Sequence, residues 1–174
     1  GKISLGTKQL LADPLQLAVA VWPAAETPLT AWRGLLACSL WIYLDFSAYS
    51  DIAIGTSRVL GIDVPENFRW PYFSVNITQF WERWHISLSQ WIRDYVFLPL
   101  GRVLYGTRLR ARPVLLAAIS FQVTFLVVGA WHGMAINFLV WGAYQGLLLP
   151  GHHVYTRRAP AWLAESPLYQ SRLA

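Results

Sequence analysis

The stretch from residue 114 to residue 150 is the most apolar part of the chain, and it limits the folds available to it. As one helix rising ~1.5 Å per residue it would extend about 55 Å, nearly twice the ~30 Å hydrocarbon core of a bilayer. Two membrane-spanning helices joined by a tight turn fit better, and the sequence GAWHG at 129–133 supplies glycines for that turn. This stretch alone favours a helical membrane protein.

Composition points to the same class. Hydrophobic residues make up 55% of the chain and charged residues 13%, about half the usual charged share of a globular protein. The ten tryptophans suit a membrane interface, where the ring lies in an apolar layer and its N–H stays wet. We therefore predict an all-α, polytopic transmembrane protein that includes re-entrant or interfacial helices.

The basic residues are placed as in a membrane protein rather than a nucleic-acid-binding one. No acid lies between Asp94 and Glu165, whereas six arginines fall there, within 102–112 and at 157–158. They flank apolar runs, as cytoplasmic loops do under the positive-inside rule. We expect both arginine groups on the cytoplasmic side and the turn that holds His132 deep in the membrane or toward the outer face. No nucleic-acid partner is expected, because the surrounding segment is mostly aliphatic.

The first part of the chain contains one short and one long apolar segment. The run LQLAVAVW at 15–22, bounded by Pro14 and Pro23, is shorter than the roughly 20 residues that a span needs. We expect it to be re-entrant, interfacial or buried. Residues 30–61 are long enough to span. The chain begins without methionine and shows no secretory signal, so we expect a fragment of a larger protein.

The middle of the chain predicts a loop followed by an amphipathic helix. Prolines exclude a continuous helix over 63–74, and Asn76 with Gln79 resembles a capping pair that starts a helix near Ile77. We expect Pro99 and Gly101 to end this helix. Its spacing predicts one shared face for seven residues: Trp81, Trp84, His85, Leu88, Trp91, Ile92 and Tyr95.

Two histidines are candidates for chemistry. His132 lies in a nearly uncharged run, where a buried ionisable side chain either faces a polar cavity and marks a function or bonds a helix carbonyl at the glycine turn. Histidine also has the unperturbed pKa that suits a general base near neutrality. For His85, spacing alone favours an interfacial histidine among aromatic side chains.

Other polar residues have structural interpretations. Asp45 and Asp51 are six residues apart, about 600° of helical turn, so they point in different directions and form no obvious acid–base pair. We expect each to bond a neighbouring loop, the alternative being cation coupling in a transporter. His152 and His153 are expected to be interfacial, and we expect no metal site.

Several stretches, taken in order, resemble one family. They are YLDFSAYSDIAIG (43–55), the run from PENFRWPYFS to FLPLG (65–101), WHG (131–133) and WGAYQGLLL (141–149), and GKISLGTKQLLADPL (1–15) precedes them. Together they resemble the membrane-bound O-acyltransferases, most closely the bacterial alginate O-acetyltransferase type.

The resemblance implies a partial domain. Residues 1–174 would hold the central motifs of the family, at 43–101 and 114–150, without its earlier and closing spans. Such an enzyme moves an acyl group from a thioester to a hydroxyl, and His132 would act as the general base on that hydroxyl. His85 would orient the donor, stabilise the oxyanion or tune His132. From their positions we add Trp84, Ser87 and Trp131 as substrate-binding candidates.

The resemblance also implies a setting and substrates. We expect a bacterial inner-membrane O-acetyltransferase that uses acetyl-CoA or another acyl thioester and has no bound cofactor. Its acceptor would be an exported, alginate-like polysaccharide or a relay partner, with extracytoplasmic acetylation proteins as partners. Peptidoglycan O-acetylation and teichoic acid D-alanylation are alternatives, although ENFRWPYFS favours the alginate and peptidoglycan branch over the teichoic acid one. From other classes, a transporter or channel segment and an inactive scaffold fragment remain open.

Overall fold

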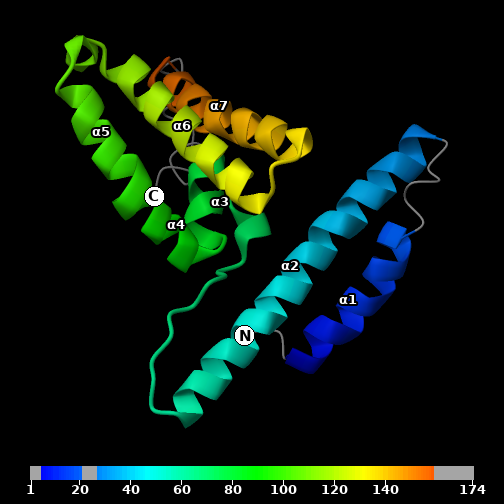
Figure 1. Cartoon of the computed structure of the whole chain (residues 1–174). Coiled ribbons are helices and arrows are strands. Elements are labelled where there is room, and N and C mark those ends of the chain that lie inside the picture. Colours follow the sequence, from blue (N-terminus) through cyan, green and yellow to red (C-terminus); the bar gives the residue numbers. More distant parts are fainter. Residues whose placement is uncertain (1–4, 21–26, 159–174) are drawn as a thin grey trace. The chain divides into compact units, whose positions relative to one another are not determined.

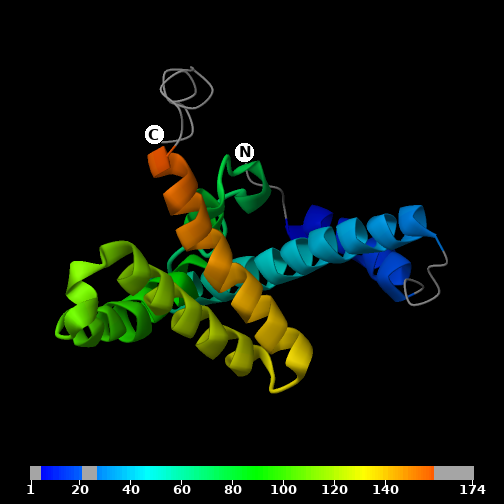
Figure 2. The same cartoon turned by 90° about the horizontal axis from the view of Figure 1, so that it is seen from above.

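A computed structural model describes residues 5–20 and 27–158, and every regular element in these two ranges is helical (Figures 1 and 2). The all-α prediction is confirmed for the described residues. The chain divides into two compact units, residues 1–68 and residues 69–174. Within each unit the helices pack against one another, and the two units are described separately below.

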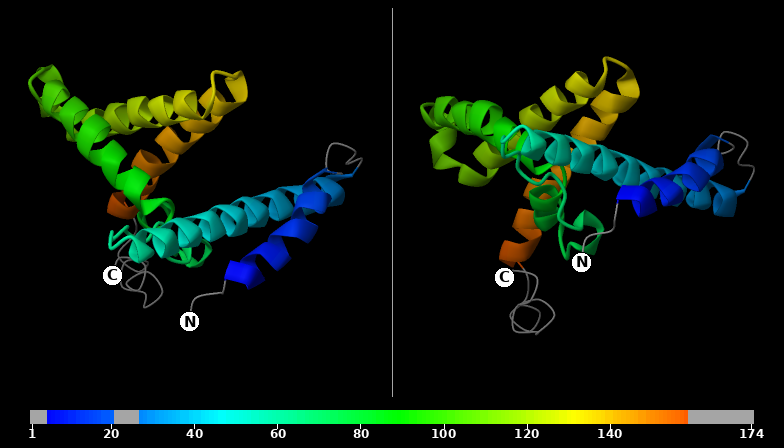
Figure 3. Two further views of the ribbon diagram at one scale, coloured as in Figure 1. Left: turned by 60° about the horizontal axis from the view of Figure 1, so that its bottom comes forward. Right: turned by 90° about the horizontal axis from the view of Figure 1, so that it is seen from below.

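The first unit is a helical hairpin of α1 (Leu5–Ala20) and α2 (Pro28–Val59), which lie side by side in antiparallel directions (Figure 3). Thr27 caps α2, because its hydroxyl accepts the backbone N–H of Thr30 at 3.2 Å while the hydroxyl of Thr30 accepts the N–H of Thr27. The buried positions of α2 are mostly small residues, which allow α1 to approach closely: Gly34, Ala37, Leu44, Ser47, Ala48, Ser50 and Ile54.

The boundary predicted at Pro14 is wrong. The first helix begins at Leu5 and continues through Pro14, which lies inside it. A proline inside a helix removes one backbone hydrogen bond. The packing of α1 along α2, with Ala12 only 4% exposed, is the contact that offsets this loss. The end of the predicted segment at residues 21–22, and its second boundary at Pro23, lie outside the described residues.

The connection between the units confirms the loop predicted over 63–74. Its only helical part is the short turn η2 (Pro71–Phe73). The cap that follows is also confirmed: the side-chain oxygen of Asn76 accepts the N–H of Gln79 at 2.8 Å, and Gln79 Oε1 accepts the N–H of Val75 at 3.0 Å. Helix α3 (Ile77–Arg83) accordingly begins at Ile77.

The single amphipathic helix predicted after Ile77 is wrong in two respects. It breaks after α3, and α4 (Ile86–Ile92) begins beyond a left-handed residue, His85. It also does not end at Pro99 and Gly101, because a π-helical turn, η3 (Arg93–Phe97), leads into α5 (Leu98–Tyr105). Pro99 falls in the first turn of α5, where its missing N–H removes no hydrogen bond within that helix.

The break also divides the predicted common face. Trp81 and Trp84 are half-buried, whereas Trp91 and Tyr95 are 55% and 68% exposed. The rings of Trp91 and Tyr95 stack on each other with centroids 5.3 Å apart. The seven residues therefore belong to two surfaces, because helical periodicity does not continue through a left-handed residue.

The second unit ends in a hairpin of α6 (Pro113–His132) and α7 (Ile136–Arg158), and η4 (Arg108–Ala111) precedes it (Figure 1). Two helices and a tight turn were predicted for residues 114–150, and both are present. Of the helices that the structure describes, only α6 is long and apolar enough to cross a membrane, with a hydropathy of 2.1.

Glycines bring α6 and α7 to backbone contact. A Cβ atom added to Gly142 would lie 2.4 Å from the carbonyl oxygen of Phe125, and one added to Gly129 would lie 2.4 Å from that of Phe138. Gly142 and Gly146 are four residues apart on α7, the small-xxx-small spacing that lets membrane helices approach closely. This packing fixes the register of the hairpin, and with it the surroundings of His132.

Candidate active site

His132 is the last residue of α6, at the tip of the α6–α7 hairpin. Its ring lies among three aromatic rings, with centroid distances of 4.8 Å to Trp131, 5.5 Å to Trp141 and 6.2 Å to Phe138. The side chain is exposed in the described part of the chain. The turn predicted at 129–133 is confirmed, since α6 ends at His132, and the depth of this side chain in a membrane stays a prediction.

His85 occupies the break between α3 and α4. Its backbone is left-handed, with φ 43° and ψ 58°, a conformation that costs a non-glycine residue about 1–3 kcal/mol. Ser89 holds the break: its N–H donates to the carbonyl of His85 at 3.0 Å and its hydroxyl donates to the carbonyl of Trp84 at 3.1 Å. The imidazole of His85 is half-buried.

The structure brings His85 and His132 together. Burial lowers the pKa of His85, and the nearby charge of His132 lowers it further. A second positive charge beside His132 is thereby disfavoured, and the neutral imidazole of His85 is favoured near neutral pH. A neutral imidazole carries one N–H donor and one free acceptor nitrogen, so His85 in this form can both donate and accept a hydrogen bond.

Aromatic side chains from three helices support the pair. Trp81 of α3 contacts Phe125 of α6 at 5.1 Å and Trp141 of α7 at 6.1 Å, between ring centroids. Trp141 in turn contacts His132. This cluster joins the segment that carries His85 to the hairpin that carries His132. Sequence reasoning did not single out Trp141 or Phe138, which are three residues apart and face His132 only in the register of this hairpin.

The three substrate-binding candidates lie at different places in the second unit. Trp131 is 64% exposed and adjoins His132. Trp84 precedes His85, but its ring stacks on Phe80 with centroids 5.6 Å apart. Ser87 is half-buried in the first turn of α4. Trp131 is therefore the candidate in ring contact with a site histidine.

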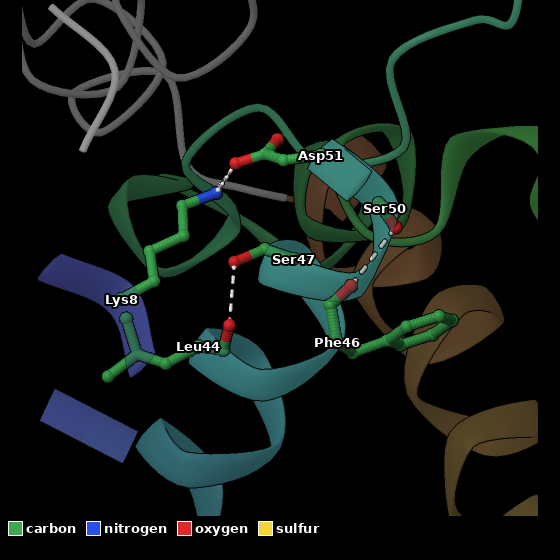
Figure 4. Close-up of polar contacts among 6 residues, drawn as sticks. All are labelled: Lys8, Leu44, Phe46, Ser47, Ser50 and Asp51. Carbon is green, nitrogen blue, oxygen red and sulfur yellow. Dashed lines mark hydrogen bonds and ion pairs between the residues drawn. The ribbon is translucent and has the colours of Figure 1, made fainter. Parts of the chain in front are cut away.

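Asp45 and Asp51 belong to the first unit, where they have separate environments. Asp51 Oδ2 accepts a hydrogen bond from Lys8 Nζ at 2.7 Å, and this ion pair links α1 to α2 (Figure 4). Beside it, the hydroxyls of Ser47 and Ser50 donate to carbonyls of their own helix. Asp45 is exposed. The partner of Asp51 is thus on a helix rather than on the loop that we expected.

Several buried polar atoms of the second unit have no hydrogen-bond partner among the described residues. They include the indole nitrogen of Trp81 and side-chain oxygens of Gln122, Thr124 and Gln145. Such atoms are few in native proteins, and each calls for a partner or a role. The sequence signal that could have found the last three is a polar side chain inside an apolar run.

Metal ligation has no support in residues 5–20 and 27–158, where no three histidine, cysteine or carboxylate side chains gather. His152 and His153 lie on α7, half-buried and exposed respectively.

Comparison with known proteins identifies relatives of this sequence. The family model of the membrane-bound O-acyltransferases matches residues 10–168. A probable alginate O-acetylase AlgI of Pseudomonas fluorescens is 44% identical over 144 residues, which are 82% of this chain and 28% of that protein.

Two less similar relatives are named for other polymers. The peptidoglycan O-acetyltransferase of Helicobacter pylori is 39% identical over 72% of this chain and 23% of its own length. The teichoic acid D-alanyltransferase of Bacillus subtilis is 34% identical over 68% and 30%. The chain thus spans less than a third of the length of the curated relatives that it matches.

Proposed function

The chain belongs to the membrane-bound O-acyltransferase family, and from this premise we propose that it contributes the catalytic histidines of a polysaccharide O-acetyltransferase. The observation that carries the proposal is the packing of α3 on the α6–α7 hairpin through Trp81, Phe125 and Trp141, which leaves His85 within range of the charge of His132, 47 positions away in sequence. In this proposal residues 1–174 are a central part of the catalytic domain.

His132 is the general base. Its free imidazole nitrogen takes the proton of the acceptor hydroxyl, whose oxygen attacks the acyl carbonyl of the thioester. The tetrahedral intermediate then collapses, the C–S bond breaks and the thiolate leaves with the proton from His132. Neutral His85 donates its N–H to the developing oxyanion or orients the donor. The position of His132 at the end of α6, beside the hairpin turn, supports access by a large acceptor.

The membrane placement follows from the helices and charges. We infer a multi-pass protein of the bacterial inner membrane in which α6 crosses the bilayer, since twenty residues extend about 30 Å. The arginines before α6 and at the end of α7 then lie on the cytoplasmic side. His132 lies toward the opposite face, where an exported polymer is accessible.

The substrates are assigned by similarity. The donor is acetyl-CoA or another acyl thioester supplied from the cytoplasmic side, and extracytoplasmic proteins assist transfer to the polymer. An alginate-like acceptor is favoured, because identity is 44% to the alginate O-acetylase against 39% to the peptidoglycan enzyme and 34% to the teichoic acid enzyme. Cation coupling through Asp51 is disfavoured, since its carboxylate already pairs with Lys8.

The test replaces the base in the complete gene product. His132→Ala should abolish acetylation of the polymer, measured as acetyl content by NMR in cells that lack other acetylases, while membrane insertion stays normal. His153→Ala is the matched control, because it removes an exposed histidine of α7 that lies outside the site. Unchanged acetyl content in the inserted His132→Ala protein would overturn the proposed function.

A further inference from the structure

Four exposed arginines gather where α5 ends and α6 begins. We call this group the basic turn: Arg102 in α5, Arg108 and Arg110 in η4, and Arg112 directly before α6. Exposed apolar and aromatic side chains lie among them, since Val103 is 69% and Tyr105 65% exposed. This combination of arginine and tyrosine next to an apolar helix is typical of a membrane–water interface.

The charges of the basic turn are uncompensated within residues 5–20 and 27–158, where none of the four arginines has an acidic partner. Arg93 gives the contrast. Its guanidinium binds both oxygens of Asp94, at 2.8 and 3.3 Å, so its charge is already paired. The basic turn therefore presents guanidinium groups that are free to bind phosphate, which matches their planar, two-pronged geometry.

The backbone holds these arginines in place. The hydroxyl of Thr107 accepts the N–H of Leu109 at 3.1 Å and donates to the carbonyl of Leu104 at 2.6 Å, which closes the end of α5 onto η4. The N–H of Arg112 donates to the carbonyl of Leu109 at 2.8 Å. These hydrogen bonds hold the turn in a defined conformation directly before the first residue of α6 (Figure 1).

We propose that the basic turn binds the headgroups of anionic phospholipids at the cytoplasmic surface. The inference rests on the proposed crossing of the membrane by α6, which places Arg108, Arg110 and Arg112 within one or two turns of the bilayer surface. A basic cluster in this position attracts anionic lipid, because the surface potential acts over about one Debye length. Tyr105 adds an interfacial anchor. The lipid so bound fixes the depth of α6, and therefore the depth of His132.

The experiment measures lipid binding to the complete gene product purified in a neutral detergent. Phosphatidylglycerol and phosphatidylcholine are titrated separately, and bound lipids are counted by native mass spectrometry. The triple variant Arg108→Gln/Arg110→Gln/Arg112→Gln should bind phosphatidylglycerol roughly 100-fold more weakly, from about a fivefold loss per arginine. The matched control is Arg93→Gln, which removes a guanidinium already paired with Asp94 and should keep the affinity within about twofold of the parent.

A triple Arg→Lys variant guards against misfolding, because it keeps the charge and should retain most of the affinity. Equal affinity of the parent for both lipids, or an unchanged affinity in the glutamine variant, would overturn the inference. So would displacement of phosphatidylglycerol by inorganic phosphate, which would assign the arginines to a free phosphate ligand.

Acetylation measured on the same proteins separates the two proposals. A parent that acetylates the polymer without preferring phosphatidylglycerol refutes the lipid inference alone. A parent that binds this lipid through the basic turn but does not acetylate refutes the proposed function alone.

Discussion

His85 lies within range of the charge of His132: burial lowers the pKa of His85 from the ordinary value of 6.5, and the charge of His132 lowers it further. The two side chains come from different helical segments, and the cluster of Trp81, Phe125 and Trp141 holds those segments together.

The first prediction concerns the titration of His85. His132→Gln removes the neighbouring charge, so the pKa of His85 should rise while remaining below 6.5 because burial persists. Histidine NMR signals of the isotopically labelled protein measure this shift, and His153→Gln should leave it unchanged. A pKa of His85 that does not move in His132→Gln would show that the two side chains do not interact.

The pH dependence of stability has a definite sign. The folded state binds a proton at His85 less readily than the unfolded chain does. The contribution of this group to the free energy of unfolding is therefore fully present above pH 6.5. That contribution should be lost as the pH falls from 6.5 through the lowered pKa of the folded state. Thermal unfolding measured across this window, for the parent and for His85→Asn, should show a smaller acid destabilisation in the variant.

The left-handed backbone at His85 predicts an order of stability among variants. His85→Val should be less stable than His85→Asn by about 1–2 kcal/mol, because a β-branched residue tolerates positive φ poorly whereas asparagine adopts it readily. At Ser87, inside α4, valine and asparagine have similar helix propensities and should differ by less. Denaturant unfolding of the four variants checks this, and equal differences at both positions would contradict it.

Close packing in the α6–α7 hairpin predicts that Gly142→Ala destabilises the protein by about 1–3 kcal/mol. The added methyl would lie 2.4 Å from a backbone oxygen of Phe125, so one helix must move. Gly151→Ala in the same helix meets no atom within 4 Å and should be neutral or stabilising by up to about 1 kcal/mol. Thermal unfolding compares them, and acetylation should fall only in Gly142→Ala.

The ion pair between Lys8 and Asp51 predicts an asymmetry between the two aspartates of α2. Asp51→Ala leaves a largely buried ammonium without its partner and should cost about 1–3 kcal/mol. Asp45→Ala changes an exposed side chain of the same helix and should have little effect. Adding Lys8→Met to Asp51→Ala should restore much of the stability. Equal losses from the two single variants would show that the ion pair does not stabilise the hairpin.

Local chemistry determined much of this fold. The length and apolarity of residues 114–150 require two helices and a tight turn, and the oxygen of Asn76 starts α3 where the sequence places it. These features depend on neighbouring residues and on the cost of leaving backbone groups unpaired. The ordered motifs around 43–101 and WHG likewise indicated the family before any contact was known.

Tertiary contacts decided the site. Helical periodicity placed His85 on a continuous face, but packing of α3 against the hairpin accompanies a break there, with a backbone that local propensity disfavours. Trp141 faces His132 because glycines bring α6 and α7 into close contact and fix the register of the hairpin. Sequence named both histidines; their proximity depends on contacts between distant residues, which no local pattern encodes.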